Sequence, residues 1–322
     1  MKKINALKKE HTAISFFSGC GGSSTGYKLA KFKVLYANEF IPEAANTYKA
    51  NHPGTIVDSA DIRTINPKDV LKSVNLKRGE LDLLDGSPPC SAFSTAGSMS
   101  KGWGEVKKYS DTTQRVDDLF FEYVRVLKYM QPKTFVAENV PAIAFGNAKC
   151  YYIEILTALR ECGYNVQAAV LDSSYLDVPQ VRKRLIFVGV RNDFVKRGFV
   201  PVFPKPNTYQ IKTSDILPHI VGIRDPAISL YISAQRPFFT ITASDATTTE
   251  TARFSSGAFV ETQCGEQRKL TIAELKILSS FPKDFELTGT FQQQWERIGR
   301  AVPPLMMYHV AKTIRDKILK LL

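Results

Sequence analysis

The sequence predicts an α/β fold, in which helices cover both faces of a parallel sheet, joined to a smaller loop-rich unit. In the first part of the chain, short apolar runs alternate with helical patterns, which is typical of such a sheet. After Arg191, Pro, Thr, Ser and Gly become frequent and the apolar runs become short. The length of 322 residues suits one large domain or two moderate ones. We therefore expect one unit over residues 1–191 and 297–322, and a second unit with its hinge over 192–296.

Strands are predicted where β-branched and aromatic residues cluster and a glycine, proline or polar turn follows. These runs are Thr12–Phe17, Lys33–Ala37, Leu81–Asp85, Thr134–Ala137, Val166–Leu171 and Arg184–Val190. Apolar stripes at helical spacing predict helices over Val116–Met130 and Tyr152–Glu161, the second ending near Gly163. A further helix is predicted over Leu270–Leu278, with Thr271 as its N-cap. The last helix begins at Pro303-Pro304, runs to Leu322, and should pack back on the first sheet.

The chain is basic, with a formal net charge of +12. This excess favours a polyanionic partner: nucleic acid, acidic lipid or a phosphorylated substrate. No apolar run reaches the roughly 18–20 residues of a membrane span, and no apolar signal core follows the basic N-terminus. The five cysteines and four histidines are scattered and form no Cys-x-x-Cys pair. We therefore expect a reducing, intracellular protein with neither a disulfide framework nor a metal site.

A glycine cluster over 17–26 follows the first strand and should open a helix. Glycines there let the backbone approach a ligand at the carboxyl ends of the strands, although a tight turn without ligand is the plain alternative. The spacing is not Gly-x-Gly-x-x-Gly and no Gly-Lys-Ser/Thr follows, which argues against a phosphate cradle. Glu39 ends the second strand about 20 residues further on, where an acid can bind ribose hydroxyls. Together with Asp61-Ile62, which could grip an adenine, these residues favour a nucleoside site.

Cys90 follows two prolines at the tip of the third strand, on a stiff backbone. A lone cysteine is more commonly a small buried side chain, but the neighbours of Cys90 argue for chemistry. Glu138 ends the next strand and should point into the same cleft. Arg182 and Arg184 lie on one face at the start of another strand, by the two-residue period. A thiolate nucleophile needs a nearby cation, and a carboxyl proton donor needs a partly enclosed site.

Taken in order, these motifs resemble the DNA cytosine-5 methyltransferase family over nearly the whole chain except 192–268. The matching elements are Phe-Ser-Gly-Cys-Gly-Gly (17–22), Glu39, Asp61-Ile62, Pro-Pro-Cys (88–90), Glu-Asn-Val (138–140), Gln-x-Arg-x-Arg (180–184), Leu-Thr-x-x-Glu (270–274) with Phe-Pro (281–282), and Gly-Arg-Ala-Val-Pro-Pro (299–304). The resemblance implies a Rossmann-like S-adenosylmethionine-dependent methyltransferase fold with a smaller target-recognition domain.

The resemblance also implies a mechanism. The target cytosine swings out of the duplex, because its C6 is unreachable within the stack. Cys90 adds to C6, and Glu138 donates a proton or a hydrogen bond to N3. Arg184 holds O2 of the base, and Arg182 supports the cleft or a phosphate. No metal is needed. Phe17 would stack on the adenine of S-adenosylmethionine, Glu39 would bind the ribose, and Asp61 with Ile62 would face the adenine edge. The implied cofactor residues are Phe17, Gly19, Gly21, Gly22, Glu39, Asp61, Ile62, Pro89, Arg300, Ala301 and Val302.

Residues 192–268 would then hold the target-recognition domain, and Ser91–Ser110 the loop that closes over DNA. The side chains suited to base edges and phosphates are Ser91, Lys101, Gln180, Arg236, Thr240, Thr242 and Arg253. For any one of them, an ordinary polar loop is the alternative. We expect a monomer on double-stranded DNA in the cytoplasm, encoded by a bacterium or a phage, with no membrane contact.

Three positions depart from the family pattern: Ser15 where Asp is frequent, Ser91 where Gln usually follows the cysteine, and Arg300 where Asn is usual. A cation at position 300 would repel the sulfonium of S-adenosylmethionine unless an anion pairs with it. Arg300 could turn to solvent or to a DNA phosphate, or pair with the methionine carboxylate. It could also bind an extra carboxylate on the transferred group, which would make carboxy-S-adenosylmethionine the donor and 5-carboxymethylcytosine the product.

Two rival functions remain. A tRNA cytosine-5 methyltransferase should carry the Cys-Phe-Thr tripeptide of that lineage, and the sequence has none. A catalytically silent DNA-binding relative should have lost Cys90, Glu138 or an arginine, and all are present.

Overall fold

The computed structural model describes residues 1–89, 118–145, 149–225, 228, 230–247 and 258–322, together with the backbone of 106–108 and 113–115. Its centre is a seven-stranded sheet of order β3-β2-β1-β4-β7-β9-β8. The strands are β1 (His11–Phe16), β2 (Phe32–Asn38), β3 (Ile56–Asp58), β4 (Leu83–Gly86), β7 (Thr134–Asn139), β8 (Tyr164–Asp172) and β9 (Lys183–Arg191). The predicted strands are therefore confirmed to within a few residues, and only the short edge strand β3 has no predicted counterpart.

The prediction of a parallel sheet is wrong for one strand. β9 runs antiparallel to both of its neighbours, β7 and β8. The reason is the short connection over 173–182, since a parallel crossover needs a dozen or more residues. Because β9 is reversed, its amino end lies at the same sheet edge as the carboxyl ends of the parallel strands. This reversal brings Arg184 to the edge where Glu138 ends β7.

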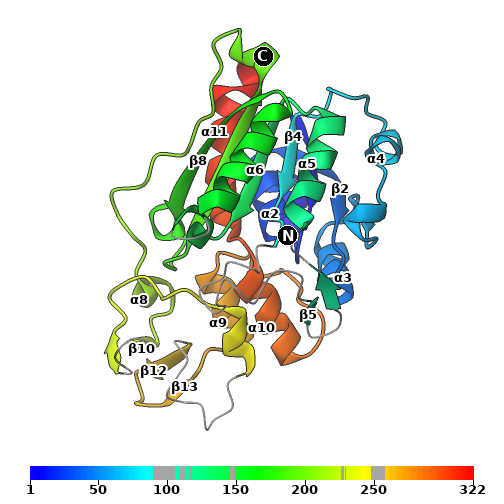
Figure 1. Cartoon of the computed structure of the whole chain (residues 1–322). Helices are drawn as coiled ribbons and strands as arrows, with labels where there is room; N and C mark the ends of the chain where they lie inside the picture. The colour runs from blue at the N-terminus through cyan, green and yellow to red at the C-terminus, as the bar shows by residue number, and fades with distance from the viewer. Residues whose placement is uncertain are drawn as a thin grey trace.

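Two helical layers cover the sheet, as expected for strands that are apolar on both faces (Figure 1). On one face, α4 (Pro67–Ser73), α5 (Leu119–Met130) and α6 (Lys149–Glu161) pack in one core with Ile14, Leu84 and Phe135. On the other, α2 (Gly22–Leu29) and α11 (Pro304–Lys317) pack with Ala13, Leu83 and Val136. The predicted return of the last helix to the first sheet is confirmed, although α11 ends at Lys317. α3 (Pro42–Asn51) connects β2 to β3.

The second unit has its own sheet, of order β11-β10-β12-β13, which lies below the large sheet in Figure 1. Its strands are β10 (Ile220–Arg224), β11 (Tyr231–Ser233), β12 (Phe259–Thr262) and β13 (Gln267–Lys269). The helices α8 (Thr213–Ile216), α9 (Ile272–Leu278) and α10 (Phe291–Arg300) accompany it, and α1 (Lys2–Asn5) contributes Met1 and Ile4 to its core. Thr271 caps α9 as predicted, in a capping box with Glu274.

The two predicted unit limits remain a prediction, and the hydrophobic cores show only how the segments near them pack. α7 (Asn192–Val195) and the following Phe199, Val202 and Phe203 pack on the large core, beyond the predicted limit at 191. α10 packs with the second unit through Trp295 and Ile298, beyond the predicted limit at 296. A further hairpin pairs β5 (Val106–Lys108) with β6 (Thr113–Arg115). Within the part of the chain that the structure describes, no helix is long and apolar enough to span a membrane.

Candidate active site

The candidate active site lies at the sheet edge where β1, β2, β4 and β7 end and β9 begins. β1 runs directly into the glycine loop, and Phe17 has a left-handed backbone with a φ of 54°. That conformation is uncommon for a bulky residue and is concentrated at functional sites. Gly19 has a φ of 55°, and among the described residues, its two chain neighbours aside, no heavy atom lies within 4 Å of the place that a Cβ would occupy. A ligand could therefore approach the backbone of Gly19 closely.

Gly21 and Gly22 must lack side chains for a different reason, which is the close approach of neighbouring protein atoms. A Cβ on Gly21 would lie 2.3 Å from Nε2 of His52, and the φ of Gly21 is +94°. A Cβ on Gly22 would lie 2.4 Å from the carbonyl oxygen of Val302. The protein itself fills these two positions, so packing explains why they are glycines. A cofactor contact of their backbones remains a prediction.

The acids at the ends of β2 and β3 hold the loops around them. Glu39 is buried, and its carboxylate accepts hydrogen bonds from the backbone N–H of Gly19 at 2.7 Å and of Ile41 at 2.9 Å. Asp61 accepts from the backbone N–H of Arg63 at 3.0 Å and pairs with its guanidinium at 2.9 Å. Ile62 is buried beside them, in the core that α5 covers. Glu39 thus joins the glycine loop to the end of β2, which sequence spacing alone did not reveal.

Four predicted site residues lie outside the described part of the chain: Cys90, Ser91, Lys101 and Arg253. The segment leading to Cys90 is described up to Pro89. Asn139 holds this segment, because its Nδ2 donates to the carbonyl oxygen of Pro88 at 3.2 Å. Its Oδ1 accepts from the backbone N–H of Val140 at 2.8 Å. Asn139 belongs to the Glu-Asn-Val motif, but it was not predicted as a site residue.

The structure brings Glu138 and Arg184, two of the predicted site residues, into contact. Nε of Arg184 lies 2.7 Å from Oε1 of Glu138, and the two side chains are 15% and 11% exposed. The same guanidinium donates through Nη1 to the carbonyl oxygen of Lys183 at 2.7 Å. A guanidinium fork suits a carboxylate, so the pair has a defined orientation. The pair places one acid and one cation at the cleft.

Arg182 is buried between the active-site edge and the second unit. It is 2% exposed, and its guanidinium donates to the carbonyl oxygens of Ile241 at 2.9 Å and Gly299 at 2.8 Å. Burial lowers the pKa of Arg182 well below its usual value, and the neighbouring Arg184 adds to this effect. The first of the two roles predicted for Arg182, support of the cleft, therefore fits the geometry. Arg182 joins the active-site edge to the second unit and to α10.

Gln180 is buried, and its contact with DNA remains a prediction. Gln180 is 1% exposed, its Nε2 donates to Oγ of Ser279 at 3.1 Å, and its Oε1 accepts from the N–H of Ile241. Strand-like pairing of 179–181 with 238–240 encloses this side chain. Sequence alone could not show which face of the Gln-x-Arg-x-Arg segment is covered.

The other predicted DNA residues in the described part of the chain lie at the surface. Arg236 is exposed and its guanidinium stacks over the ring of Phe239 at 5.4 Å. Thr240 and Thr242 are exposed, and their hydroxyls donate to the carbonyl oxygen of Val181 and to Asp245. Their contact with DNA remains a prediction.

Arg300 ends α10, with a side chain that is 42% exposed. Its Nη2 lies 3.7 Å from Oε2 of the buried Glu296, one helical turn earlier. The carboxylate of Glu296 therefore lies near the positive charge of Arg300, which would otherwise repel the sulfonium of S-adenosylmethionine. Ala301 is half-buried, and Val302 is buried against α2 and α11.

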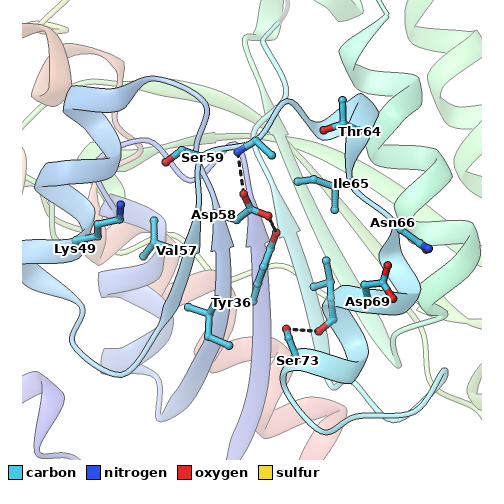
Figure 2. Close-up of a pocket in the computed structure, with 13 residues that line it drawn as sticks. Tyr36, Lys49, Val57, Asp58, Ser59, Thr64, Ile65, Asn66, Asp69 and Ser73 are labelled. Atoms are coloured by element: carbon cyan, nitrogen blue, oxygen red, sulfur yellow. Dashed lines mark hydrogen bonds between the residues drawn. The ribbon is translucent and has the colours of Figure 1, made fainter.

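A pocket of about 630 Å³ lies beside the edge strand β3, between β2 and α4 (Figure 2). Asp58 is central to it and accepts hydrogen bonds from Oη of Tyr36 at 2.6 Å and from the N–H of Ala60 at 2.8 Å. None of the predicted cofactor residues lines this pocket. In the described ranges, no group of three His, Cys, Asp or Glu residues is arranged to hold a metal ion.

Solved structures define the class of fold. A putative DNA modification methyltransferase encoded within an E. coli prophage superposes with a TM-score of 0.67 at 20% identity, over 96% of this chain and all of that one. DNMT2 of Spodoptera frugiperda, crystallised as a triple mutant, gives 0.69 at 17% identity, over 93% and 98%. The chain therefore has the α/β methyltransferase fold that the sequence predicted, with the correction made above for β9.

Sequence comparisons then give the family. The model of the C-5 cytosine-specific DNA methylases matches residues 11–227 and 223–316. The type II methyltransferase M1.HphI of Haemophilus parahaemolyticus is 30% identical over 335 residues, 94% of this chain and 86% of that one. M.NgoPII of Neisseria gonorrhoeae is 28% identical, covering 94% of both chains. This chain belongs to the C-5 cytosine-specific DNA methylase family, and its enzyme class is that of the DNA cytosine-5 methyltransferases.

Proposed function

We propose that this protein swings a cytosine out of duplex DNA and methylates its C5 through a covalent adduct with Cys90, using S-adenosylmethionine. One observation carries the proposal. The Glu138–Arg184 pair, 2.7 Å across, stands at the same sheet edge as the open glycine loop and the Pro88-Pro89 segment that leads to Cys90. The acid and the cation therefore lie at the edge where the described chain ends at Pro89, and Cys90 is the next residue in the sequence.

The residues at the ends of β1 and β2 fit the adenosyl part of S-adenosylmethionine. The space beside Gly19 is open, and the buried carboxylate of Glu39 suits ribose hydroxyls. Phe17 would cover a face of the adenine, with Asp61 and Ile62 at its edge. When bound, S-adenosylmethionine supplies an electrophilic methyl group. Pro89, Gly21, Gly22, Ala301 and Val302 would complete the surrounding wall.

The protein's own groups activate the cytosine. The Cys90 thiolate forms a bond to C6, and the electrons of the C5–C6 double bond make C5 nucleophilic as Glu138 protonates N3. Arg184 holds the base through O2 and orients Glu138. After C5 has taken up the methyl group, a base removes the C5 proton. The double bond then re-forms, Cys90 leaves as thiolate, and the N3 proton returns to Glu138.

Double-stranded DNA is the proposed partner of the basic chain. A net charge of +12 suits a polyanion, and binding should weaken as salt rises, because DNA releases its counterions when a protein binds. We assign Arg236, Thr240 and Thr242 to the DNA side of the second unit, together with Ser91, Lys101 and Arg253. The relatives described above are type II methyltransferases of bacteria, which supports this partner and a bacterial cytoplasmic setting. We expect one protomer on each DNA site.

The test is transfer of a labelled methyl group to unmethylated DNA, followed by mass analysis of the nucleosides and sequencing of the modified positions. We expect 5-methylcytosine in one sequence context. Methylation of adenine, or of tRNA in preference to duplex DNA, would overturn the proposal.

Arg300 supports a second candidate for the donor, carboxy-S-adenosylmethionine with 5-carboxymethylcytosine as product. The observation that favours it is a 42% exposed guanidinium at a position next to Ala301 and Val302 of the proposed cofactor wall. Against it, Glu296 already offers Arg300 a carboxylate at 3.7 Å. Offering both donors in one reaction and weighing the product separates the two. Methyl transfer without any carboxymethyl product would exclude this candidate.

A further inference from the structure

Asp85 is a buried carboxyl that the proposed mechanism does not use. It lies in β4, one residue before the strand ends, and is 1% exposed. It is paired in register with Ser15 of β1 on one side and Val136 of β7 on the other. Leu83, two residues earlier, points to the face that α2 and α11 cover, so by the period of a strand Asp85 points there too.

Asp85 connects three elements of the active-site edge. Oγ of Ser15, at the end of β1, donates to its Oδ2 at 2.6 Å. Oη of Tyr27, in α2, donates to its Oδ1 at 2.7 Å. Ser18 of the glycine loop extends the network, because its Oγ lies 3.1 Å from Oγ of Ser15 and also donates to the Ser15 carbonyl oxygen at 3.0 Å. The same carboxyl thus contacts both ends of the loop, and it stands on the strand that leads to Pro88-Pro89 and Cys90.

The surroundings of Asp85 disfavour the ionised form of its carboxyl group. Among the described residues, Tyr27 of α2, Tyr48 of α3, Tyr123 of α5 and Glu138 of β7 interact electrostatically with Asp85. Burial, with Glu138 adding to it, raises the pKa of Asp85 to about 7 against the hydrogen bonds from Ser15 and Tyr27. Since this pKa lies above the ordinary value of 3.8, ionisation of Asp85 opposes folding, and the cost grows as pH rises from about 4 to about 7. A buried group that weakens the fold is expected where function needs it.

We propose that Asp85 is a positioning residue that fixes the glycine loop relative to β4, the strand that leads to Cys90. This inference rests on the proposed function for the roles of the two loops. It assigns to Asp85 no contact with substrate or cofactor. Its effect passes through Ser15, Ser18 and Tyr27 to the loop backbone, and along β4 to Cys90. Misplacement of a reacting group by about 1 Å can slow an enzyme by about 100-fold, so a positioning residue of this kind has a measurable effect.

The first test is Asp85→Asn, which keeps the shape and removes the buried charge. We expect the melting temperature at pH 8 to stay the same or to rise. The affinity for S-adenosylmethionine, measured by calorimetry without DNA, should fall about 10-fold, and kcat should fall about 10- to 100-fold. Tyr27→Phe, which removes one donor and keeps the charge, should lower both the melting temperature and the affinity.

Asp82 offers a matched control, because it is a buried carboxyl next to the opposite end of β4. It is bound by Thr12 and by Lys133 at 2.6 Å, far along the strand from the loops. Asp82→Asn should lower the melting temperature and leave the affinity and kcat within about twofold. If Asp85→Asn behaves like Asp82→Asn, with stability lost and both functional values kept, Asp85 is structural only and the proposal is wrong.

A swap across the register adds a second readout. Ser15→Asp alone would place two carboxyls face to face in a buried site, and Asp85→Ser alone would leave none. The double variant restores one carboxyl between the same strands and should recover cofactor affinity to within a few-fold of the wild-type value. A double variant no better than Asp85→Ser contradicts the proposal. If wild-type protein binds S-adenosylmethionine but transfers no methyl group to DNA, the proposed function fails, and the binding measurements still decide the role of Asp85.

Discussion

The Nε of Arg184 and the Oε1 of Glu138 lie 2.7 Å apart, although the two residues come from strands that run in opposite directions. Reversal of β9 puts the amino end of that strand beside the carboxyl end of β7. The sheet topology thus creates the acid–cation pair of the cleft. Several expected outcomes follow from this and from neighbouring contacts.

Arg184→Lys keeps a positive charge but loses the planar fork, so methyl transfer should fall about 100-fold with little loss of stability. Glu138→Gln removes the proton donor and should slow transfer by about 100- to 10,000-fold. Steady-state kinetics and thermal unfolding check both. Arg191→Lys at the other end of β9 is the control and should leave kcat unchanged. Full activity of Arg184→Lys would contradict the role of the fork.

Cys90→Ala should abolish product formation, because no other group forms the bond to C6 in the proposed mechanism. Binding of S-adenosylmethionine should remain within a few-fold of the wild-type value. A radiolabel assay and calorimetry measure the two. Cys264→Ala, at an exposed cysteine of the second unit, should behave as wild type. Residual transfer by Cys90→Ala would argue for a different nucleophile.

Gly21→Ala and Gly19→Ala should separate packing from ligand access. The Cβ at position 21 would collide with His52 at 2.3 Å in addition to the strained φ of +94°, so we expect several kcal/mol of lost stability. At position 19 only the left-handed φ of +55° opposes the change, at about 1–2 kcal/mol. Gly19→Ala should instead weaken cofactor binding strongly. Denaturant unfolding and calorimetry compare the pair, and equal stability losses would contradict this account.

Glu274 anchors α9 to the small sheet. It accepts hydrogen bonds from Arg268 at 2.8 and 2.9 Å, from His219 at 2.7 Å and from its cap residue Thr271. Although burial acts in the opposite direction, the hydrogen bonds from Arg268, His219 and Thr271 lower its pKa from 4.5 to about 2. A lowered pKa stabilises the fold above the unfolded value, and this stability is lost as pH falls from about 4.5 to about 2.

Glu274→Gln should therefore cost up to about 3 kcal/mol at pH 7, a difference that shrinks toward pH 2. Unfolding in urea at several pH values measures it. A cost that did not change with pH would show that the charge of Glu274 is not responsible.

Arg300→Asn tests the donor. If Arg300 binds a carboxylate on the transferred group, the variant should lose use of carboxy-S-adenosylmethionine and retain or gain methyl transfer. If Arg300 serves only as a partner of Glu296, at 3.7 Å and partly exposed, both activities should change by less than about threefold and stability by less than about 1 kcal/mol. Nucleoside mass analysis after reaction with each donor distinguishes the outcomes.

The sequence by itself determined the α/β class, six of the seven strands of the large sheet, and the motif order that identifies the family. Local patterns carry this information, because strand periodicity, turn residues and caps act over a few neighbouring positions. The sequence singled out Glu138 and Arg184 as site candidates, but their pairing depends on the reversal of β9.

Only the tertiary structure decided what depends on contacts distant in sequence. The short link before β9 reversed that strand. The side chain of Gln180 is buried against Ser279, and the close approach of His52 leaves no room for a Cβ at Gly21. Arg182 donates hydrogen bonds to Ile241 and Gly299. Asp85 meets Ser15 only because β1 and β4 are neighbours in the sheet, 70 residues apart in the chain. Burial and pairing arise when the chain folds back on itself, and no local pattern records them.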